Sequence, residues 1–167
     1  LLKIGIDLGG TKTEIIAMDD RGKALLRRRV ATPSRDYAAI LSTIADLVLG
    51  AEAELGARGS IGVGAPGAVS TATGSLKNSN TACLNGKPLQ QDLEKLLGRQ
   101  VRVANDANCF ALSEAVDGAG AGAPVVFGVI LGTGVGGGIV IDGRILEGAN
   151  SIAGEWGHNP LAAGEPD

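Results

Sequence analysis

The chain has 167 residues, of which 44% are hydrophobic and 20% are charged, a length and composition that suit one globular domain, or one domain plus part of another. A formal charge of −3 gives no sign of the basic surface that binds nucleic acid. The first residues enter a strand at once and no apolar stretch reaches membrane-spanning length, so we expect a cytoplasmic protein whose partners are neither nucleic acid nor membrane.

The N-terminal residues predict three consecutive strands, at 3–8, 13–18 and 24–30. The first two are joined by a tight turn that contains the adjacent glycines Gly9 and Gly10. Because glycine has no Cβ, backbone N–H groups can point into such a turn and favour an anion, of which phosphate is the natural example. A plain hairpin turn explains one such sequence equally well, so the decision depends on the rest of the chain.

Strands and helices alternate after this antiparallel meander. Capping residues and apolar spacing predict, in order, a helix from Asp36 to Gly56, a strand at 61–65, a helix from Pro88 to Gly98, a strand at 101–104 and a helix at 107–116. The second of these helices is expected to bury Leu89, Leu93, Leu96 and Leu97. This alternation predicts an α/β domain with a mixed sheet.

A stretch of small residues, "DGAGAGAP" at 117–124, predicts a domain boundary after residue 118, between domains at 1–118 and 119–167. The segment 127–146 that follows repeats the first hairpin: apolar strand, glycine- and threonine-rich turn, apolar strand. Two phosphate-holding hairpins facing each other across a hinge would hold a triphosphate between them.

Six motifs carry a resemblance to a known family: "DLGGTKTE", "GAPGAV", "KNSNTACLNGKPL", "NDANCFALSEA", "LGTGVGGG" and "AGEWGHNPL". They occur in the order found in the ROK family of bacterial sugar kinases, which the chain resembles over essentially its whole length. The resemblance implies a ribonuclease-H-like (actin-like ATPase) α/β fold, with the start of a second, similar domain that breaks off before the family's cysteine-rich zinc motif.

The resemblance implies ATP-dependent phosphorylation of a hexose. "KNSNTACLNG" and "GEWGHNPL" look most like the fructokinase (mannokinase) branch, which would convert fructose to fructose 6-phosphate. "NDANCFALSEA" and "ILGTGVGGG" look equally like the N-acetylglucosamine kinase branch, so N-acetylglucosamine, glucose and mannose stay as alternative substrates. A ROK-type sugar-sensing transcriptional regulator without kinase activity is the alternative from another class, and the intact D-x-G-G-T turn favours catalysis over it.

Phosphorylation of a sugar needs a base near the attacking hydroxyl, donors for the phosphates and a divalent cation. The resemblance makes Asp106 the catalytic base, although an Asp at this place is also an ordinary helix cap. Asn80 and Asn105 carry amide groups suited to sugar hydroxyls, although Asn in a loop is more often only a turn residue. Beside Asp106, the resemblance assigns further contacts with the sugar to Glu155 and His158. An acid and an imidazole three residues apart, as at 155 and 158, can accept from and donate to neighbouring hydroxyls of one ring.

The cofactors that the resemblance implies are ATP and Mg²⁺. The phosphates are assigned to Gly9, Gly10, Thr11 and Lys12 in the first loop and to Gly132, Thr133 and Gly134 in the second, with Asp7 as the acid near Mg²⁺. A solvated turn lysine is an equally simple explanation of Lys12. Zn²⁺ would bind His158 only together with the downstream cysteines of full-length members, so we expect no closed zinc site in this chain by itself. The resemblance also implies a homodimer for the full-length protein.

Overall fold

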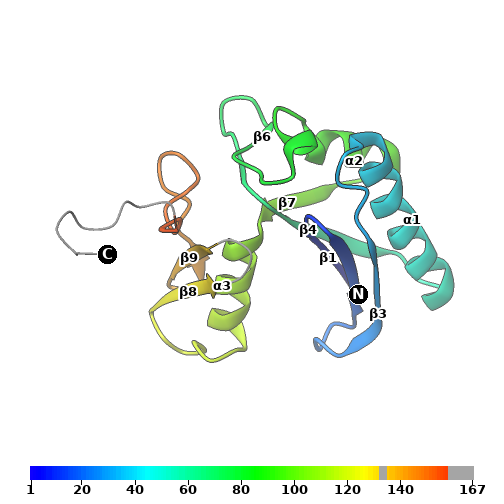
Figure 1. Cartoon of the computed structure of the whole chain (residues 1–167). Coiled ribbons are helices and arrows are strands. Elements are labelled where there is room, and N and C mark those ends of the chain that lie inside the picture. The colour runs from blue at the N-terminus through cyan, green and yellow to red at the C-terminus, as the bar shows by residue number, and fades with distance from the viewer. Residues whose placement is uncertain (132–134, 158–167) are drawn as a thin grey trace. The chain divides into compact units, whose positions relative to one another are not determined.

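The structure, a computed structural model, describes residues 1–131 and 135–157 (Figure 1). By their internal contacts the residues form two compact units, Leu1–Asp106 and Ala107–Asp167. The division between these units falls at residue 106, and the domain boundary after residue 118 stays a prediction. In the described residues no helix is long and apolar enough to cross a membrane.

The first unit contains a five-stranded mixed sheet in the order β3-β2-β1-β4-β7. Its elements are β1 (Leu2–Leu8), β2 (Lys12–Met18), β3 (Ala24–Ala31), α1 (Tyr37–Leu55), β4 (Gly59–Ala65), β5 (Ala68–Val69), β6 (Leu76–Lys77), the 3₁₀ turn η1 (Ala82–Leu84), α2 (Leu89–Leu97) and β7 (Val101–Asn105). The first three strands pair antiparallel, whereas β4 pairs parallel with β1 and β7 pairs parallel with β4. The predicted meander and mixed sheet are confirmed, and the short β5–β6 hairpin is an addition.

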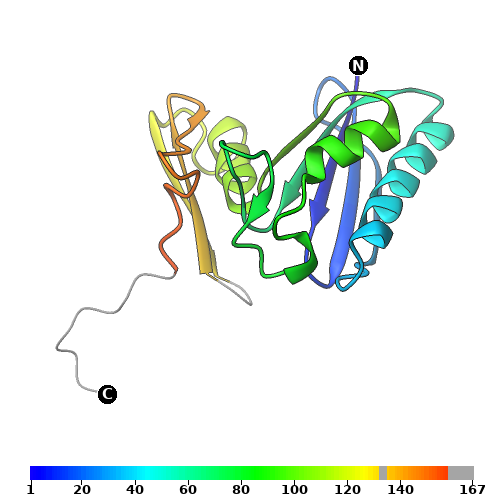
Figure 2. The ribbon, with the colours of Figure 1, turned by 90° about the horizontal axis from the view of Figure 1, so that it is seen from above.

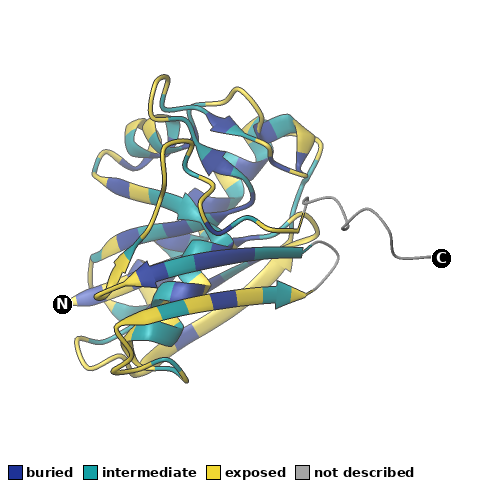
Figure 3. Cartoon of the chain, turned by 90° about the vertical axis from the view of Figure 1, so that its left-hand side faces the viewer, coloured by how far each residue is buried: buried dark blue, intermediate teal, exposed yellow. Residues whose placement is uncertain are grey.

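Buried residues at alternate positions of the strands contribute to the core of this unit. Every second residue of β1, from Leu2 to Leu8, is buried, while those between them are exposed or half-buried. Figure 3 colours the described residues by burial. Helices α1 and α2 lie side by side (Figures 1 and 2), and the buried side of each belongs to the same apolar cluster as the even residues of β1. The sheet therefore has one face covered by these two helices.

The helix ends follow the predicted caps. The Asp36 carboxylate accepts the Ala39 N–H (3.1 Å) at the start of α1, and Gly56 and Gly98 end α1 and α2 in the left-handed conformation with φ of 63° and 65°. The predicted buried side of α2 is wrong at one position: Leu96 is 54% exposed. The buried leucines of α2 recur every fourth residue, and Leu96 falls outside that stripe.

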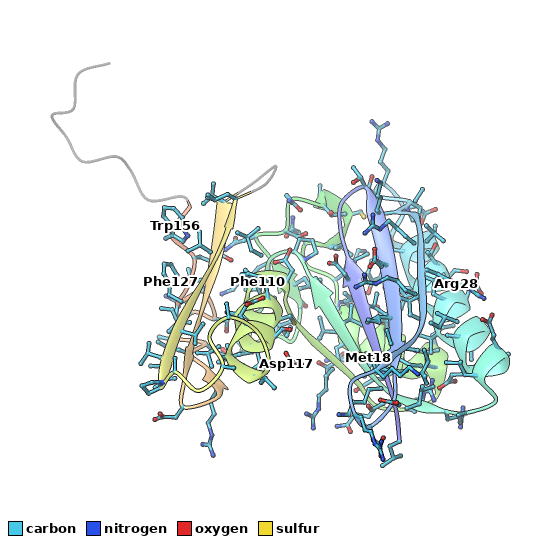
Figure 4. The ribbon with its side chains drawn as sticks, turned by 90° about the horizontal axis from the view of Figure 1, so that it is seen from below. Met18, Arg28, Phe110, Asp117, Phe127 and Trp156 are labelled. Carbon is cyan, nitrogen blue, oxygen red and sulfur yellow. The ribbon has the colours of Figure 1, made fainter. Side chains whose placement is uncertain are left out.

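Arginines 27–29 of β3 point alternately to the two faces of the sheet. Arg27 and Arg29 both pair with Glu14 on β2, whereas Arg28 pairs with Glu54 on α1. Figure 4 labels Arg28 beside that helix. The basic run is thus divided between two carboxylates instead of forming one basic patch.

The second unit contains a three-stranded antiparallel sheet in the order β10-β9-β8, joined to helix α3, whose first residue ends the first unit. Its elements are α3 (Asp106–Val116), β8 (Val125–Leu131), β9 (Val135–Ile141) and β10 (Arg144–Ile145). Glycines allow α3 to approach the sheet closely: a Cβ at Gly128 would lie 2.8 Å from the Ala111 Cβ, and one at Gly138 would lie 2.7 Å from the Ala107 oxygen. Part of the glycine-rich sequence 134–138 therefore serves helix packing.

Candidate functional site

The parallel strands β1, β4 and β7 end at one edge of the first unit's sheet. In the register Asp7 lies opposite Gly64, which in turn lies opposite Ala104, so Asp7 and the end of β7 are separated by two strand spacings, about 10 Å. The chain leaves this edge as the Gly9–Gly10 turn after β1 and as Asp106 after β7. The carboxyl edge of parallel strands is the usual place for ligands in open α/β sheets.

The first turn is closed by its own backbone. The Gly9 N–H donates to the Lys12 carbonyl oxygen (3.0 Å), and the Thr32 hydroxyl on the neighbouring segment donates to the Gly9 carbonyl oxygen (2.8 Å). The Thr32 N–H donates to the Thr11 carbonyl oxygen (2.9 Å). These bonds fix the turn without using Gly10, which has room around it, because a Cβ there would meet nothing nearer than the Thr81 Oγ1 at 3.4 Å.

The side chain of Thr81 lies beside this turn, so a second segment of the chain reaches the same edge of the sheet. Residues 78–81 include the predicted sugar ligand Asn80, which is exposed, and we call them the sugar loop after that prediction alone. Two neighbours of Asn80 in this loop, Ser79 and Thr81, are buried, and the Thr81 N–H donates to the Ser79 hydroxyl oxygen (3.1 Å). The sugar loop is therefore held from inside while Asn80 faces outward.

Gly67 joins this loop to the end of β7. A Cβ at Gly67, whose φ is +90°, would lie 2.4 Å from the Lys77 oxygen and 2.8 Å from the Ser79 nitrogen, so only glycine fits here. The side-chain N–H₂ of Asn105 donates to the Gly67 carbonyl oxygen (2.9 Å) and to Oδ1 of Asp106 (3.2 Å). These contacts bring the sugar loop and two predicted site residues, Asn105 and Asp106, into one connected arrangement.

Asp106 is the first residue of α3 and follows β7 directly. Its carboxylate thus lies in the first helical turn, where unpaired backbone N–H groups favour negative charge. It is half-buried, as is Asn105. A rigid strand end and the hydrogen bond from Asn105 together fix the direction of a group that could accept a proton.

Asp7 differs electrostatically from its neighbour Glu14, which lies opposite it on β2. Glu14 is paired with two arginines, Arg27 and Arg29. Partial burial, and then the charge of Glu14, raise the pKa of Asp7, while Arg29 lowers it. A carboxylate whose ionised form is disfavoured by its surroundings gains from a nearby cation, and a carboxylate oxygen is a ligand that suits Mg²⁺. Asp7 thus fits the predicted metal role chemically.

Among residues 1–131 and 135–157, no group of three or more His, Cys, Asp and Glu side chains is arranged to hold a metal ion. Cys83 and Cys109 are both unbridged, and the Cys83 thiol donates to the Ser34 carbonyl oxygen (3.2 Å). The predicted zinc ligand His158 and the second phosphate loop, Gly132, Thr133 and Gly134, lie outside the described residues.

The second unit places Glu155 against β9. A Cβ at Gly136 would lie 3.6 Å from the Glu155 Oε2, and the neighbouring Trp156 donates its indole N–H to the Gly136 carbonyl oxygen (3.2 Å). Figure 4 shows Trp156 on the same side of this sheet as Phe127, with Phe110 on the other side. The segment that carries Glu155 is thus tied to the sheet by its tryptophan.

Sequence reasoning named no role for Gly67, Thr81 or Asn85, although each contributes to this arrangement. The signal for Gly67 was present in "GAPGAV", where glycine after proline indicates a turn that needs positive φ. No local signal indicates Asn85, whose side chain binds a segment six residues earlier in the chain.

Known proteins are similar to this chain over most of its length. The model of the ROK family matches residues 3–167. An N-acetyl-D-glucosamine kinase of Pectobacterium atrosepticum is 48% identical over 154 residues, which cover 92% of this chain and 51% of that protein. An N-acetylgalactosamine kinase of a Shewanella species is 45% identical over 159 residues, which cover 95% of this chain and 51% of that protein.

A solved structure is similar to this chain as well. The ROK family glucokinase of Streptomyces griseus, in complex with glucose and AMPPNP, matches with a TM-score of 0.86 and 35% identity over 97% of this chain and 51% of that chain. This likeness confirms the predicted actin-like ATPase fold, and the chain spans about half the length of these relatives. The name of the Pectobacterium relative supports the N-acetylglucosamine alternative better than the predicted fructokinase branch. Because the family model matches nearly the whole of this chain, the chain belongs to the ROK family.

Proposed function

We propose that the full-length protein transfers a phosphoryl group from ATP to a hydroxyl of an N-acetylhexosamine, with Asp106 as the general base. One observation carries the proposal: Gly67 packs against the sugar loop and accepts a hydrogen bond from Asn105, which also donates to Asp106. A base, an amide and a polar loop are thereby held at the sheet edge that also carries the glycine turn after β1.

In this mechanism Asn80 and Asn105 bind sugar hydroxyls, and Asp106 accepts the proton of the attacking hydroxyl. The first turn offers backbone N–H groups to the phosphates, and Lys12, exposed at the start of β2, adds a positive charge. Mg²⁺, when bound beside the phosphates, neutralises part of their charge. Asp7 is the residue of the first unit that we propose to hold it.

Glu155 and His158 complete the sugar contacts in the proposal, and Gly132, Thr133 and Gly134 supply the second phosphate loop. The choice of an N-acetylhexosamine over fructose is supported by relatives at 45–48% identity that are named as kinases of acetylated amino sugars. Zinc binding through His158 and the formation of a homodimer stay predictions from the family resemblance.

The proposal is tested by a coupled assay of ADP formation by the full-length gene product, with N-acetylglucosamine, N-acetylgalactosamine, glucose, mannose and fructose in parallel. We expect an acetylated sugar to give the highest kcat/KM, by roughly tenfold or more over fructose, because a site built for the acetamido group leaves polar groups unpaired without it. The highest value with fructose would restore the fructokinase assignment. Sugar binding without ADP formation would favour the regulator alternative.

A further inference from the structure

Asn85 binds both backbone groups of a single residue in the sugar loop. Its side-chain N–H₂ donates to the Ser79 carbonyl oxygen (2.9 Å), and its Oδ1 accepts the Ser79 N–H (2.8 Å). An amide side chain carries a donor and an acceptor in one plane and so copies what a neighbouring strand would offer. Asn85 thus does for the sugar loop what a sheet partner does for a strand.

The two bonds matter because the loop has no regular structure to satisfy Ser79. Ser79 is only 7% exposed, and it lies between β6 and η1. Buried backbone groups that lose their partners each cost about 1–3 kcal/mol. Without Asn85, the loop would have to rearrange so that the Ser79 backbone could find other partners.

Asn85 itself projects from a fixed base. The residue before it, Leu84, is fully buried, and the Gly86 N–H after it donates to the Leu76 carbonyl oxygen (2.8 Å). The Leu76 N–H in turn donates to the Lys87 carbonyl oxygen (2.9 Å). The side chain of Asn85 therefore connects a well-anchored arm to the sugar loop.

A change in the conformation of the sugar loop would affect two neighbours of Ser79. Asn80 follows Ser79 directly, and Gly67, which hydrogen-bonds to Asn105, lies against the Ser79 backbone. We propose that Asn85 is a positioning residue that keeps the sugar loop in the conformation that binds sugar. This inference rests on the proposed function, because it assigns the loop to the sugar.

Loss of the Asn85 side chain should weaken the binding of sugar but not the binding of ATP. If the binding conformation of the loop is populated only part of the time, the apparent affinity for sugar falls by that fraction. The first phosphate turn is closed by bonds of Gly9 and Thr32 that do not involve Asn85, so ATP binding should change little.

The experiment uses the full-length protein with Asn85→Ala, Asn85→Asp and the control Thr73→Ala. Thr73 lines the same open depression of about 490 Å³ as Asn85, and its hydroxyl accepts only the N–H of Ser75 within its own turn among the hydrogen bonds of the described residues. The measurements are KM for N-acetyl-D-glucosamine, KM for ATP, and hydrogen exchange of the Ser79 amide.

For Asn85→Ala we expect the sugar KM to rise on the order of tenfold, the ATP KM to change less than about twofold, and the Ser79 amide to exchange faster. For Asn85→Asp, the ratio of its sugar KM to that of the wild type should fall as the pH is lowered, because a protonated carboxyl again has a donor and an acceptor. Asn85→Asp also keeps the test valid if the alanine variant does not fold.

The inference is overturned if the Asn85 variants keep the wild-type sugar KM, if both KM values rise equally, or if Thr73→Ala has the same effect. Failure of the proposed function is seen separately in the wild type, which would then phosphorylate none of the sugars in the panel, and it would remove this inference as well. An active wild type with unaffected Asn85 variants contradicts the inference alone.

Discussion

Gly9 donates its N–H to the carbonyl oxygen of Lys12 (3.0 Å), and a Cβ at Gly9 would lie only 2.8 Å from that same oxygen. The turn after β1 therefore closes only with glycine at position 9. Gly10 has no such neighbour within the unit, since the nearest atom to a Cβ there is the Thr81 Oγ1 at 3.4 Å. The fold itself thus requires glycine at position 9, whereas only a ligand that approaches the backbone would require glycine at position 10.

Gly10→Val should weaken ATP binding by roughly tenfold or more, because the side chain would occupy the space that a phosphate needs beside the backbone. Its Tm should stay near that of the wild type. Gly9→Val, the matched control, should instead lower the Tm through the clash with Lys12. Calorimetric ATP titrations and thermal melts of the full-length variants measure both effects, and wild-type ATP affinity in a folded Gly10→Val protein would remove this turn from the phosphate site.

Asp7→Asn should raise the Tm at pH 7 and have little effect near pH 4. The pKa of Asp7 is raised, so its protonated form is favoured by the fold. That contribution to stability is complete below the ordinary Asp pKa and is lost as the pH rises through the raised value. The uncharged asparagine does not suffer this loss.

The metal role of Asp7 gives the same variant a second test. Thermal melts with and without MgATP should show stabilisation of the wild type and a smaller effect on Asp7→Asn, because the proposed Mg²⁺ ligand is gone. A lower Tm for Asp7→Asn at pH 7 would contradict the electrostatic account of this residue, and equal stabilisation of both proteins by MgATP would contradict its metal role.

Arg99→Ala should lower the free energy of unfolding by about 1–3 kcal/mol, because it leaves the buried carboxylate of Glu52 without its cation. Nη2 of Arg99 lies 2.8 Å from Oε1 of Glu52, which also accepts the Gly59 N–H (2.8 Å). The ion pair is close but poorly directed, since Nη2 and Nε of Arg99 make no hydrogen bond to the described residues. The lower part of the range therefore applies.

Arg28→Ala is the control for this experiment, because its pair with Glu54 is exposed on both sides and should contribute at most about 1 kcal/mol. Urea denaturation of both full-length variants gives the comparison. Equal losses from the two substitutions would mean that burial of Glu52 does not decide the strength of its ion pair.

Glu155→Gln should raise the KM for sugar on the order of tenfold and leave the KM for ATP nearly unchanged, because the amide keeps the shape of the side chain but not its charge. Glu147→Gln, at an exposed position of the same unit, is the matched control and should change neither constant. Parallel increases in both KM values would indicate a folding defect instead of a lost sugar contact.

Local signals in the sequence predict most of the first unit. The caps at Asp36, Gly56 and Gly98 and the alternation in β1 depend on a few neighbouring residues, and the structure has them where the sequence places them. Leu96 is an error of the same local reasoning, because the number of apolar residues in a short helix does not show how wide its buried stripe is.

The connections within the candidate site could not be predicted in this way. The contacts of Gly67 with Ser79 and with Asn105 join residues far apart in the chain, and they depend on where β6 and β7 lie once the sheet has formed. The glycines at 128 and 138 allow α3 to approach the sheet, a role that the composition of this segment does not indicate.

Asp106→Asn tests the central claim most directly. Asparagine keeps the size of the side chain and an oxygen for the hydrogen bond from Asn105, but it cannot accept the proton of the sugar hydroxyl. Stability should change by about 1 kcal/mol or less. Sugar affinity should also be largely kept.

The measurement is kcat of the full-length Asp106→Asn enzyme with saturating ATP and N-acetyl-D-glucosamine, next to its Kd for the sugar. The account predicts that kcat falls by roughly two to four orders of magnitude while the Kd stays within a few-fold of the wild type. Turnover near the wild-type rate would leave Asp106 as a residue that only begins α3, and the proposed mechanism would be wrong.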